Sequence, residues 1–370
     1  MGHRYVSGEF AFVSPAKAKA LQANLARPSD LVFTQRGTLG QVALVPTGPY
    51  KEYLISQSQM KLTLDCGAAA PGYVHQYFAS ALGQKQILDS AIQTGVPHTN
   101  LGILRNYAVP MPRRVDEQDA IAAALTDADA LIDSLEQLLT KKRQIKQGAM
   151  QELLTGKRRL PGFAGPWISC TWDDVIDDCS SGATPLRSCP EYYRGSIRWI
   201  SSGELDYNVI DDTIEHISSE AFEKTNLKLH PAGTFLMAIT GLEAAGTRGA
   251  CGIVGKPATT NQSCMAIYPS NKLLTAYLFQ YYVYKGDDLA LRYCQGTKQQ
   301  SYTAALIRVL PIEYPESTDE QLAIAQALSD IDAEIATLEA RLTKASAFKQ
   351  AMAQALLTGR IRLVSEGAVT

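Results

Sequence analysis

The sequence predicts an α/β protein: two mixed α/β domains separated by two long antiparallel coiled-coil helices, with pseudo-twofold symmetry. Three observations lead to this expectation. A 45-residue segment occurs twice in the chain. Both copies carry apolar residues in alternating steps of three and four, the pattern of a coiled-coil helix. The two other parts of the chain alternate short β-like runs with turns and helical stretches.

The duplicated segment is the strongest signal in the chain. Residues 116–160 recur without a gap at residues 319–363, and 26 of the 45 positions are identical at a constant offset of 203. A duplication of this length does not arise from composition. Two equal helices, each following its own globular segment, predict a pseudo-symmetric protein. Such a protein suits a roughly symmetric target, of which duplex DNA is the commonest.

Long helices are expected at residues 113–160 and 316–364. Val115 offers no side-chain cap to the first helix, whereas Thr318 and Gln321 form a candidate capping box for the second. We expect the two helices to pack antiparallel along an apolar seam. Two helices of an ordinary bundle are the alternative, which the length of both segments disfavours. The expected seam of the second helix comprises Ile324, Leu328, Ile331, Ile335, Leu338, Leu342, Ala345, Phe348, Met352 and Leu356.

The two globular domains are expected at residues 1–112 and 161–315. They also repeat weakly, because residues 37–45 parallel residues 246–254. The sequence therefore predicts two related mixed α/β domains, each followed by one long helix. Strand-like runs lie at residues 30–33, 40–45, 60–64, 234–239, 251–254 and 264–268, with helical runs at 74–82 and 273–284.

Composition narrows the class of protein. The net charge of −2 gives no global sign of nucleic-acid binding, so a DNA-binding face would have to be locally basic. Seven cysteines form an odd set without a CxxC pair, as expected of reduced thiols and not of a disulfide framework or a zinc site. No run of 18 apolar residues and no signal-peptide pattern occurs, which predicts a soluble cytoplasmic protein.

Catalytic signatures are missing from the sequence. There is no GxxxxGK[ST] phosphate loop, no GxGxxG after a strand and no Asn-Pro-Pro-aromatic segment of an adenine methyltransferase. The five histidines never fall at metal-ligand spacing. We therefore expect a non-catalytic protein without a catalytic or metal site of its own.

Polar loops next to glycines recur at matching places in the two domains. Arg beside Gly can reach a phosphate or a guanine edge, and Asn or Gln can read adenine. Such residues are equally common in ordinary turns, so the recurrence in two domains is what favours a function. The candidate DNA-binding residues are Arg36, Gln57, Gln59, Thr184, Arg248, Asn261, Gln262, Lys298, Gln299 and Gln300.

A family resemblance rests on these segments. The repeated DEQxxIAxxL…LLTG(K/R)xRL helices resemble the two long-helix regions of specificity subunits from type I restriction–modification systems. The segments GATP, RWISSGEL and LPIEYP, which begin at Gly182, Arg198 and Leu310, resemble the target-recognition domains of that family. The resemblance covers almost the whole chain. It implies a non-catalytic subunit of a methyltransferase/endonuclease complex, in which each domain reads one half of a bipartite DNA target.

The resemblance also implies partners and cofactors. Two methyltransferase subunits would dock on this chain, and restriction/translocase subunits would join them on double-stranded DNA. S-adenosylmethionine, ATP and Mg²⁺ are expected on those partner subunits, with none bound by this chain.

The first domain departs from the family pattern. Residue 1 aligns with about position 205, so the first domain should be N-terminally truncated relative to the family, without counterparts of residues 165–204. Either the sequence begins at a wrongly chosen start, or the truncation is natural. In the second case the first domain should read its half-site less stringently.

Three alternatives stay open. The first is the specificity protein of a fused type II restriction–methylation system. The second is a structural coiled-coil protein, which predicts no continuous basic face. The third is an enzyme of unknown chemistry, which a buried and strongly shifted titratable pair in a cleft would support.

Overall fold

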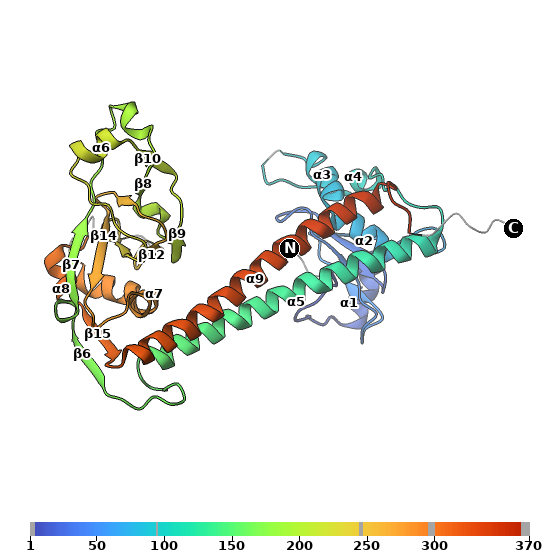
Figure 1. Ribbon diagram of the computed structural model, residues 1–370. Coiled ribbons are helices and arrows are strands. Elements are labelled where there is room, and N and C mark those ends of the chain that lie inside the picture. The colour runs from blue at the N-terminus through green and yellow to red at the C-terminus, as the bar shows by residue number, and fades with distance from the viewer. Residues whose placement is uncertain (1–3, 94, 244–246, 295–299, 364–370) are drawn as a thin grey trace. The chain divides into compact units, whose positions relative to one another are not determined.

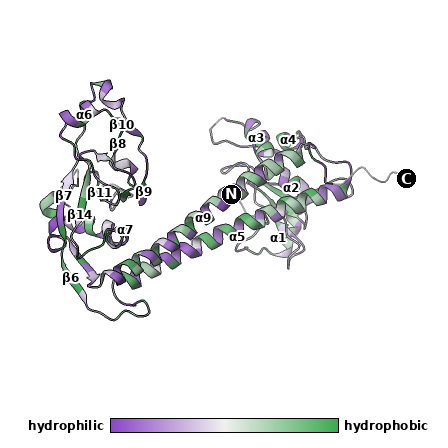
Figure 2. Ribbon diagram, viewed as in Figure 1, coloured by the Kyte–Doolittle hydropathy of each residue, from purple (hydrophilic) through white to green (hydrophobic). Residues whose placement is uncertain are grey.

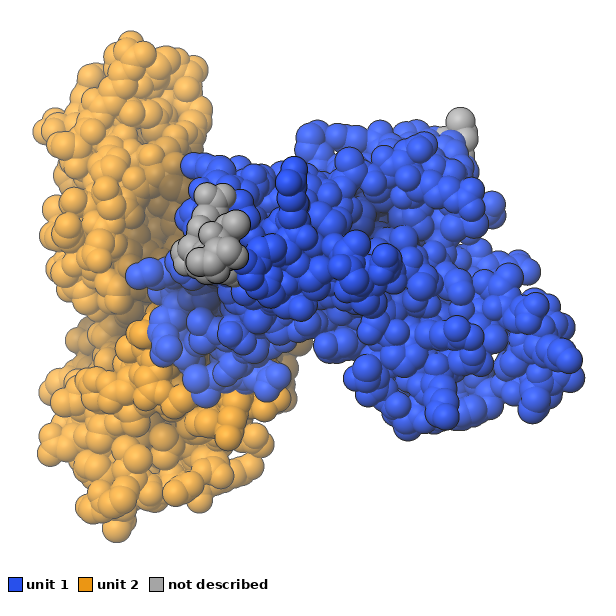
Figure 3. All heavy atoms as spheres, turned by 90° about the vertical axis from the view of Figure 1, so that its right-hand side faces the viewer, with its two compact units in different colours: residues 1–139, 338–370 blue, residues 140–337 orange. Residues whose placement is uncertain are grey.

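The structure is a computed structural model that describes residues 4–93, 95–243, 247–294 and 300–363. The chain forms two compact units (Figure 3). Unit 1 comprises residues 1–139 and 338–370, and unit 2 comprises residues 140–337. Each unit therefore combines one globular domain with parts of both long helices.

The two long helices are α5 (Val115–Leu153) and α9 (Thr318–Leu357), with 39 and 40 residues (Figure 1). Both are shorter than expected from the sequence. Gly156 and Gly359 follow them with φ values of 67° and 73°, in the left-handed region that stops a helix. The expected capping box at Thr318 is wrong. Thr318 is already helical, and the Ser317 hydroxyl accepts from the Glu320 amide instead, at 3.4 Å.

The apolar seam is confirmed in part. Hydrophobic and hydrophilic residues alternate along both helices (Figure 2). Ile324, Leu328, Ile335 and Leu338 are buried, as expected. Phe348 was expected in the seam, but 65% of its surface is exposed. Ile145, 203 residues earlier, is also exposed, so this position faces outward in both helices.

Unit 1 is built on a three-stranded antiparallel sheet in the order β3-β2-β5. Leu31 on β2 pairs with Leu44 on β3 and with Leu62 on β5. Helix α2 packs with this sheet and α5 in one hydrophobic core. The remaining elements of the unit are short. The bounds are α1 Pro15–Ala20, a 3-10 turn at Gln22–Asn24, β1 Leu25–Ala26, β2 Leu31–Thr34, β3 Val42–Leu44, β4 Tyr53–Leu54, β5 Gln59–Leu62, α2 Pro71–Ala79, α3 Ala81–Asp89 and α4 Leu101–Arg105.

Unit 2 contains a five-stranded sheet in the order β7-β14-β11-β12-β9, with two smaller sheets, β10-β8-β13 and β15-β6. Helix α7 packs with the large sheet in the main core of the unit. The strands are β6 Trp167–Thr171, β7 Ile176–Ser181, β8 Ile197–Ile200, β9 Asn208–Ile210, β10 Glu215–Ile217, β11 Phe235–Ala238, β12 Cys251–Val254, β13 Thr259–Thr260, β14 Cys264–Pro269 and β15 Pro311–Pro315. The helices are α6 Ser219–Lys224, α7 Thr275–Tyr293 and α8 Ala304–Arg308, with 3-10 turns at Trp172–Asp174, Pro190–Tyr193 and Ser202–Glu204.

Ion pairs show that the helices run antiparallel within each unit. In unit 1, the Arg362 guanidinium donates to both oxygens of Glu117 at 2.5 and 2.6 Å. In unit 2, Arg159 donates in the same way to Glu320. Each residue of the second pair lies 203 positions from its counterpart in the first. Both Glu side chains are 1% exposed, so each carboxylate depends on its arginine.

A second set of contacts ties each helix to its domain. The Gln118 side chain accepts from the Ala70 amide at 2.7 Å and donates to the carbonyls of Ala68 and Pro112. The corresponding Gln321 accepts from the Leu274 amide at 2.8 Å and donates to the carbonyls of Lys272 and Pro315. The equivalent residues in both units make equivalent hydrogen bonds.

The Glu117–Arg362 pair predicts a pH-dependent stability. Hydrogen bonding from Arg362 lowers the pKa of the Glu117 carboxyl. Because its folded-state pKa is depressed, the pair stabilises the fold fully above about pH 4.5, and this contribution is lost as pH falls further. Glu117→Gln should lower the melting temperature at pH 7, and the gap to wild type should close toward pH 3. Asp119→Asn, at an exposed site on α5, is the control. A gap that stayed constant with pH would contradict the pairing.

Candidate nucleic-acid interface

Three loops meet at one end of the unit 2 sheet. The Ile239 amide at the end of β11 donates to the Ser263 carbonyl at 2.9 Å. The Tyr302 amide donates to the Ile239 carbonyl at 2.9 Å, and Thr240 forms a bridge with Ser301. Ser263 before β14 and residues 301–302 after α7 therefore both contact the end of β11. This sheet end carries the candidate residues Asn261, Gln262 and Gln300.

A fourth loop, residues 182–187, joins the same end after β7. The Ala183 amide donates to the Thr260 carbonyl at 3.1 Å, and the Thr184 hydroxyl donates to the Gln262 side chain. The structure thus brings the candidate residues Thr184, Asn261 and Gln262 together. Asn261 is fixed as well, because its side-chain oxygen accepts from the Ser263 amide at 3.0 Å.

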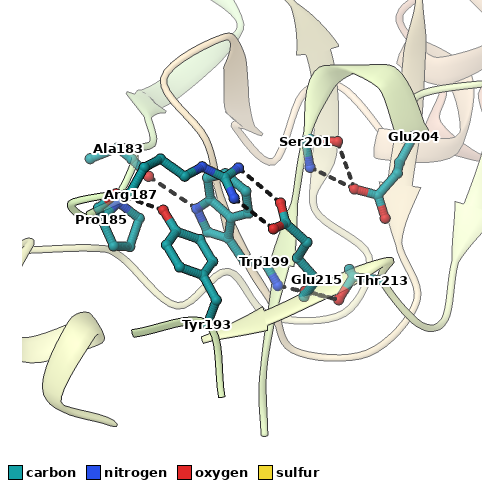
Figure 4. A network of polar contacts seen from close by, with 9 residues as sticks. All are labelled: Ala183, Pro185, Arg187, Tyr193, Trp199, Ser201, Glu204, Thr213 and Glu215. Carbon is teal, nitrogen blue, oxygen red and sulfur yellow. Dashed lines mark hydrogen bonds and ion pairs between the residues drawn. The ribbon is translucent and has the colours of Figure 1, made fainter. Parts of the chain in front are cut away.

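An aromatic and charged network holds this fourth loop (Figure 4). The Trp199 indole donates to the Ala183 carbonyl at 3.0 Å, and the Tyr193 hydroxyl donates to the Pro185 carbonyl at 2.6 Å. The Arg187 guanidinium lies 4.3 Å from the ring centre of Tyr193 and 5.1 Å from that of Trp199. These contacts hold Ala183, Pro185 and Arg187, while Leu186 is exposed.

Arg187 also forms a two-pronged ion pair with Glu215, at 2.6 and 2.9 Å. This pair lowers the pKa of the Glu215 carboxyl, so the acid is ionised at neutral pH. Sequence reasoning missed Arg187, Tyr193 and Glu215, because only the fold brings Glu215 to Arg187, which lies 28 positions earlier, and places Tyr193 against the guanidinium. Trp199 lies in the RWISSGEL segment, which the sequence analysis had already identified as part of a target-recognition domain.

Arg248 and Gln300, two other predicted contact residues, already interact with residues of their own unit. Arg248 forms an ion pair with Asp287 at 2.9 Å, and only 19% of its side chain is exposed. This pair competes with any contact between Arg248 and a base. The Gln300 amide donates to Glu243 at 3.2 Å, while the Gln300 side-chain oxygen is buried without a partner among the described residues. Lys298 and Gln299 lie outside the described residues.

Unit 1 repeats the arrangement of loops. The Gln35 amide donates to the Ser58 carbonyl at 2.7 Å, and the Thr99 amide donates to the Gln35 carbonyl at 3.0 Å. Arg36 forms a bridge with His98, as Thr240 does with Ser301 in unit 2. Arg36 therefore occupies the register position of Thr240. Of the other two candidates, Gln57 is exposed, and Gln59 accepts from the Ser56 amide at 3.0 Å.

Two buried histidines lie away from the loop tips. Burial lowers the pKa of His230 to about 4 and that of His75 to about 4, so both are neutral at pH 7. His230 bonds through its ring to the Tyr268 and Thr260 hydroxyls, beside the loop that carries Asn261. No group of three or more His, Cys, Asp or Glu side chains is placed to hold a metal ion in the described parts of the chain. Over the same parts, no helix is long and apolar enough to cross a membrane.

The profile of the family described as "Type I restriction modification DNA specificity domain" matches residues 16–147 and 166–345. The chain belongs to this family. Two specificity subunits from Methanocaldococcus jannaschii are similar to it. The type I restriction enzyme MjaIX specificity subunit is 29% identical over 42% of this chain and 36% of its own length. The MjaVIII specificity subunit is 22% identical over 78% of this chain and 70% of its own length. The chain thus aligns with about a third of the first relative.

Solved structures of the family share the fold. The S subunit of a type I restriction-modification system from M. genitalium has a TM-score of 0.62 at 15% identity, over 89% of this chain and 83% of that chain. A chain from a study of complex assembly and conformational transition of the type I R-M system has a TM-score of 0.53 at 17% identity, over 91% and 83%. Two mixed α/β domains with two long helices are therefore the fold of this specificity-family chain.

The 182–187 loop has no room for a side chain at Gly182. A Cβ there would lie 1.9 Å from the Thr260 carbonyl oxygen. Gly182→Ala should therefore push the 182–187 loop off β13 and cost about 1–3 kcal/mol of stability. Gly165→Ala, where nothing lies within 4 Å of the added Cβ, is the matched control and should change stability by less than about 0.5 kcal/mol. Urea denaturation measures both. Equal stability of the two variants would show that the loop does not rest on Thr260.

Proposed function

We propose that this chain is the DNA sequence-specificity subunit of a type I restriction–modification complex. The observation that carries the proposal is the cluster of fixed polar side chains at one sheet end, in a chain of the DNA specificity domain family. Side chains held by hydrogen bonds lose little entropy on binding and can discriminate base edges. Thr184, Asn261 and Gln262 are the residues assigned to base contacts in unit 2.

The target is a bipartite sequence of double-stranded DNA. Unit 1 carries its own set of three loops, with Arg36, Gln57 and Gln59 as the contact residues. The duplicated interactions support one DNA half-site for each domain.

Two methyltransferase subunits dock on the long helices. Two identical partners need two similar surfaces, and the helices are the most similar parts of the chain. Ile145 and Phe348 support this assignment, since they are 203 positions apart and 45% and 65% exposed. An exposed apolar side chain at the same position of both repeats is expected of an interface.

This chain acts in the cytoplasm as a non-catalytic scaffold. The methyltransferase subunits bring S-adenosylmethionine, and the restriction/translocase subunits bring ATP and Mg²⁺. The specificity protein of a fused type II system is the second candidate, and relatives named type I specificity subunits disfavour it. A purely structural coiled-coil protein would not need polar clusters at equivalent sheet ends.

Selection from a duplex DNA library with random sequence tests the proposal. The chain should enrich two short specified segments separated by an unspecified spacer of constant length. Enrichment of no sequence, or of one continuous sequence, would contradict a bipartite target.

Base discrimination by unit 2 should depend on Asn261 and Gln262. Asn261→Ala or Gln262→Ala should each reduce discrimination at one base pair by about 1–3 kcal/mol, because a bidentate amide contact is lost. Asn271→Ala is the matched control, since Asn271 is exposed at the other end of β14. Competition binding with single-base variants of the selected duplex measures the effect. A control variant with the same loss would place the contact elsewhere.

Methyltransferase docking should depend on the exposed apolar positions of the helices. Ile145→Asp and Phe348→Asp should each remove one of two bound methyltransferase copies, because a charge would be desolvated in the interface. Val209→Asp, at a 58% exposed site on β9, is the control and should keep both copies. Native mass spectrometry of the complex gives the stoichiometry. Two copies retained in both helix variants would exclude this surface.

A further inference from the structure

Two large aliphatic side chains of unit 2 lie exposed near the polar residues assigned to base contacts. Leu186 belongs to the 182–187 loop and is 62% exposed, and Ile214 belongs to the turn between β9 and β10 and is 85% exposed. Single aliphatic residues are common on protein surfaces, so exposure alone indicates no function. The position and the bracing of these two residues distinguish them.

The small sheet β10-β8-β13 places Ile214 at the same end as Asn261. Strands β8 and β13 are parallel, and the Asn261 amide after β13 donates to the Ile200 carbonyl at the end of β8, at 2.9 Å. Strand β10 is antiparallel to β8, with Glu215 opposite Trp199. The residue before Glu215 therefore comes to the level of Ile200, where β8 ends.

The 182–187 loop lies at this end as well. The Thr184 hydroxyl donates to the Gln262 side chain, and Leu186 follows two residues later. The next residue, Arg187, pairs with Glu215 at 2.6 and 2.9 Å. This ion pair joins the residues that directly follow the two exposed aliphatic residues. Both of them therefore border the polar cluster.

The turn that carries Ile214 is held by the RWISSGEL segment, residues 198–205. The Ile214 amide donates to the Glu204 carboxylate at 2.9 Å. This carboxylate also accepts from the Ser201 amide and hydroxyl, both at 2.8 Å, and the Trp199 amide donates to the Thr213 hydroxyl at 3.3 Å (Figure 4). The backbone at Ile214 is thus fixed while its side chain is almost fully exposed.

Trp199 braces both aliphatic residues. Its backbone holds the turn at Thr213, and its indole donates to the Ala183 carbonyl in the 182–187 loop at 3.0 Å. A side chain on a braced backbone loses less conformational freedom when it binds a partner. The bracing therefore suits Leu186 and Ile214 to contact a ligand.

The acids next to Ile214 are paired within the unit. Asp212 pairs with Arg198 at 3.3 Å, and Glu215 pairs with Arg187. Unpaired carboxylates would repel the phosphates of DNA, and these ion pairs limit that repulsion.

The chemistry of the two side chains selects one kind of group on DNA. Leucine and isoleucine have no side-chain donor or acceptor, so they cannot form hydrogen bonds with base edges or phosphates. The apolar group that a base edge presents in the major groove is the C5 methyl of thymine. The nearby Asn261 and Gln262 carry amides, which suit the adenine edge in the same groove. Both kinds of side chain therefore favour A·T pairs.

We propose that Leu186 and Ile214 contact the C5 methyl groups of thymines in the half-site read by unit 2. This inference rests on the proposed function and adds two specificity residues to it. The contact distinguishes thymine by its methyl group alone, because neither side chain forms a hydrogen bond with the base.

Replacement of thymine by deoxyuridine tests the proposal, since deoxyuridine lacks only the methyl group. Each thymine of the duplex selected with the full chain is replaced in turn, and competition binding gives the dissociation constant. At least one replacement, in the half-site that Asn261→Ala affects, should weaken binding by about fourfold, because one buried methyl group is lost. Leu186→Ala or Ile214→Ala should abolish this difference at its own position, so that the thymine and deoxyuridine duplexes bind equally.

Val309→Ala is the matched control, at a 52% exposed aliphatic site. The preceding Arg308 pairs with Asp173, which lies before β7, whereas the 182–187 loop follows β7. This variant should keep the wild-type difference between thymine and deoxyuridine.

Three results would overturn the proposal. They are wild-type binding that no deoxyuridine replacement weakens, a selected half-site of G·C pairs alone, and alanine variants that keep the full difference. Alanine variants that bind both duplexes equally weakly, when wild type does not distinguish the two, would indicate a wedge between bases and not a methyl contact. A wild-type chain that selects no sequence would instead contradict the proposed function, and this inference with it.

Discussion

Two buried glutamates fix the register of the long helices. Glu117 and Glu320 sit at the first turns of α5 and α9, almost without solvent contact, and each is paired with an arginine that follows the end of the other helix. Leaving such a carboxylate unpaired in the interior is very costly, so a helix shifted by one turn is not an accessible alternative. The same helix turns carry Gln118 and Gln321, whose amides bind the backbone just before α2 and α7. One turn of each helix therefore sets both the helix pairing and the position of a domain.

Within each unit, packing contacts link this helix turn to the polar loops. Helices α2 and α7 pack with the sheets, and the strands of each sheet end at the polar loops. The Tyr73 and Tyr277 hydroxyls reinforce the connection by donating to the carbonyls of Pro110 and Glu313, at 2.7 and 2.9 Å. In unit 2 the loop at residues 182–187 is further held by Trp199. A rigid path from helix to contact residue is the physical requirement for base discrimination, because a loosely held side chain accepts more than one base edge.

The parts of this fold that the sequence predicts are those with local or periodic causes. The duplication located both helices, and alternating apolar residues located the main strands within one or two residues. The prediction of a capping box failed because the Gln321 side chain donates to the Lys272 carbonyl and does not cap the start of its own helix. The prediction that Phe348 lies in the seam failed because the spacing of apolar residues does not distinguish a buried seam from a second, exposed apolar face. The Arg187–Glu215 pair and the Arg248–Asp287 pair join residues 28 and 39 positions apart, and no local pattern reports such contacts.

The central claim is that each helix turn with its buried glutamate positions one domain for reading one half of the target. Selection from the random duplex library with Glu117→Gln and with Glu320→Gln tests this directly. Glu117→Gln should reduce base specificity in one half of the enriched sequence and leave the other half unchanged. Glu320→Gln should reduce base specificity in the opposite half. If either substitution reduced specificity in both halves equally, or if neither changed the enriched sequence, the claim that each glutamate positions its own domain would be wrong.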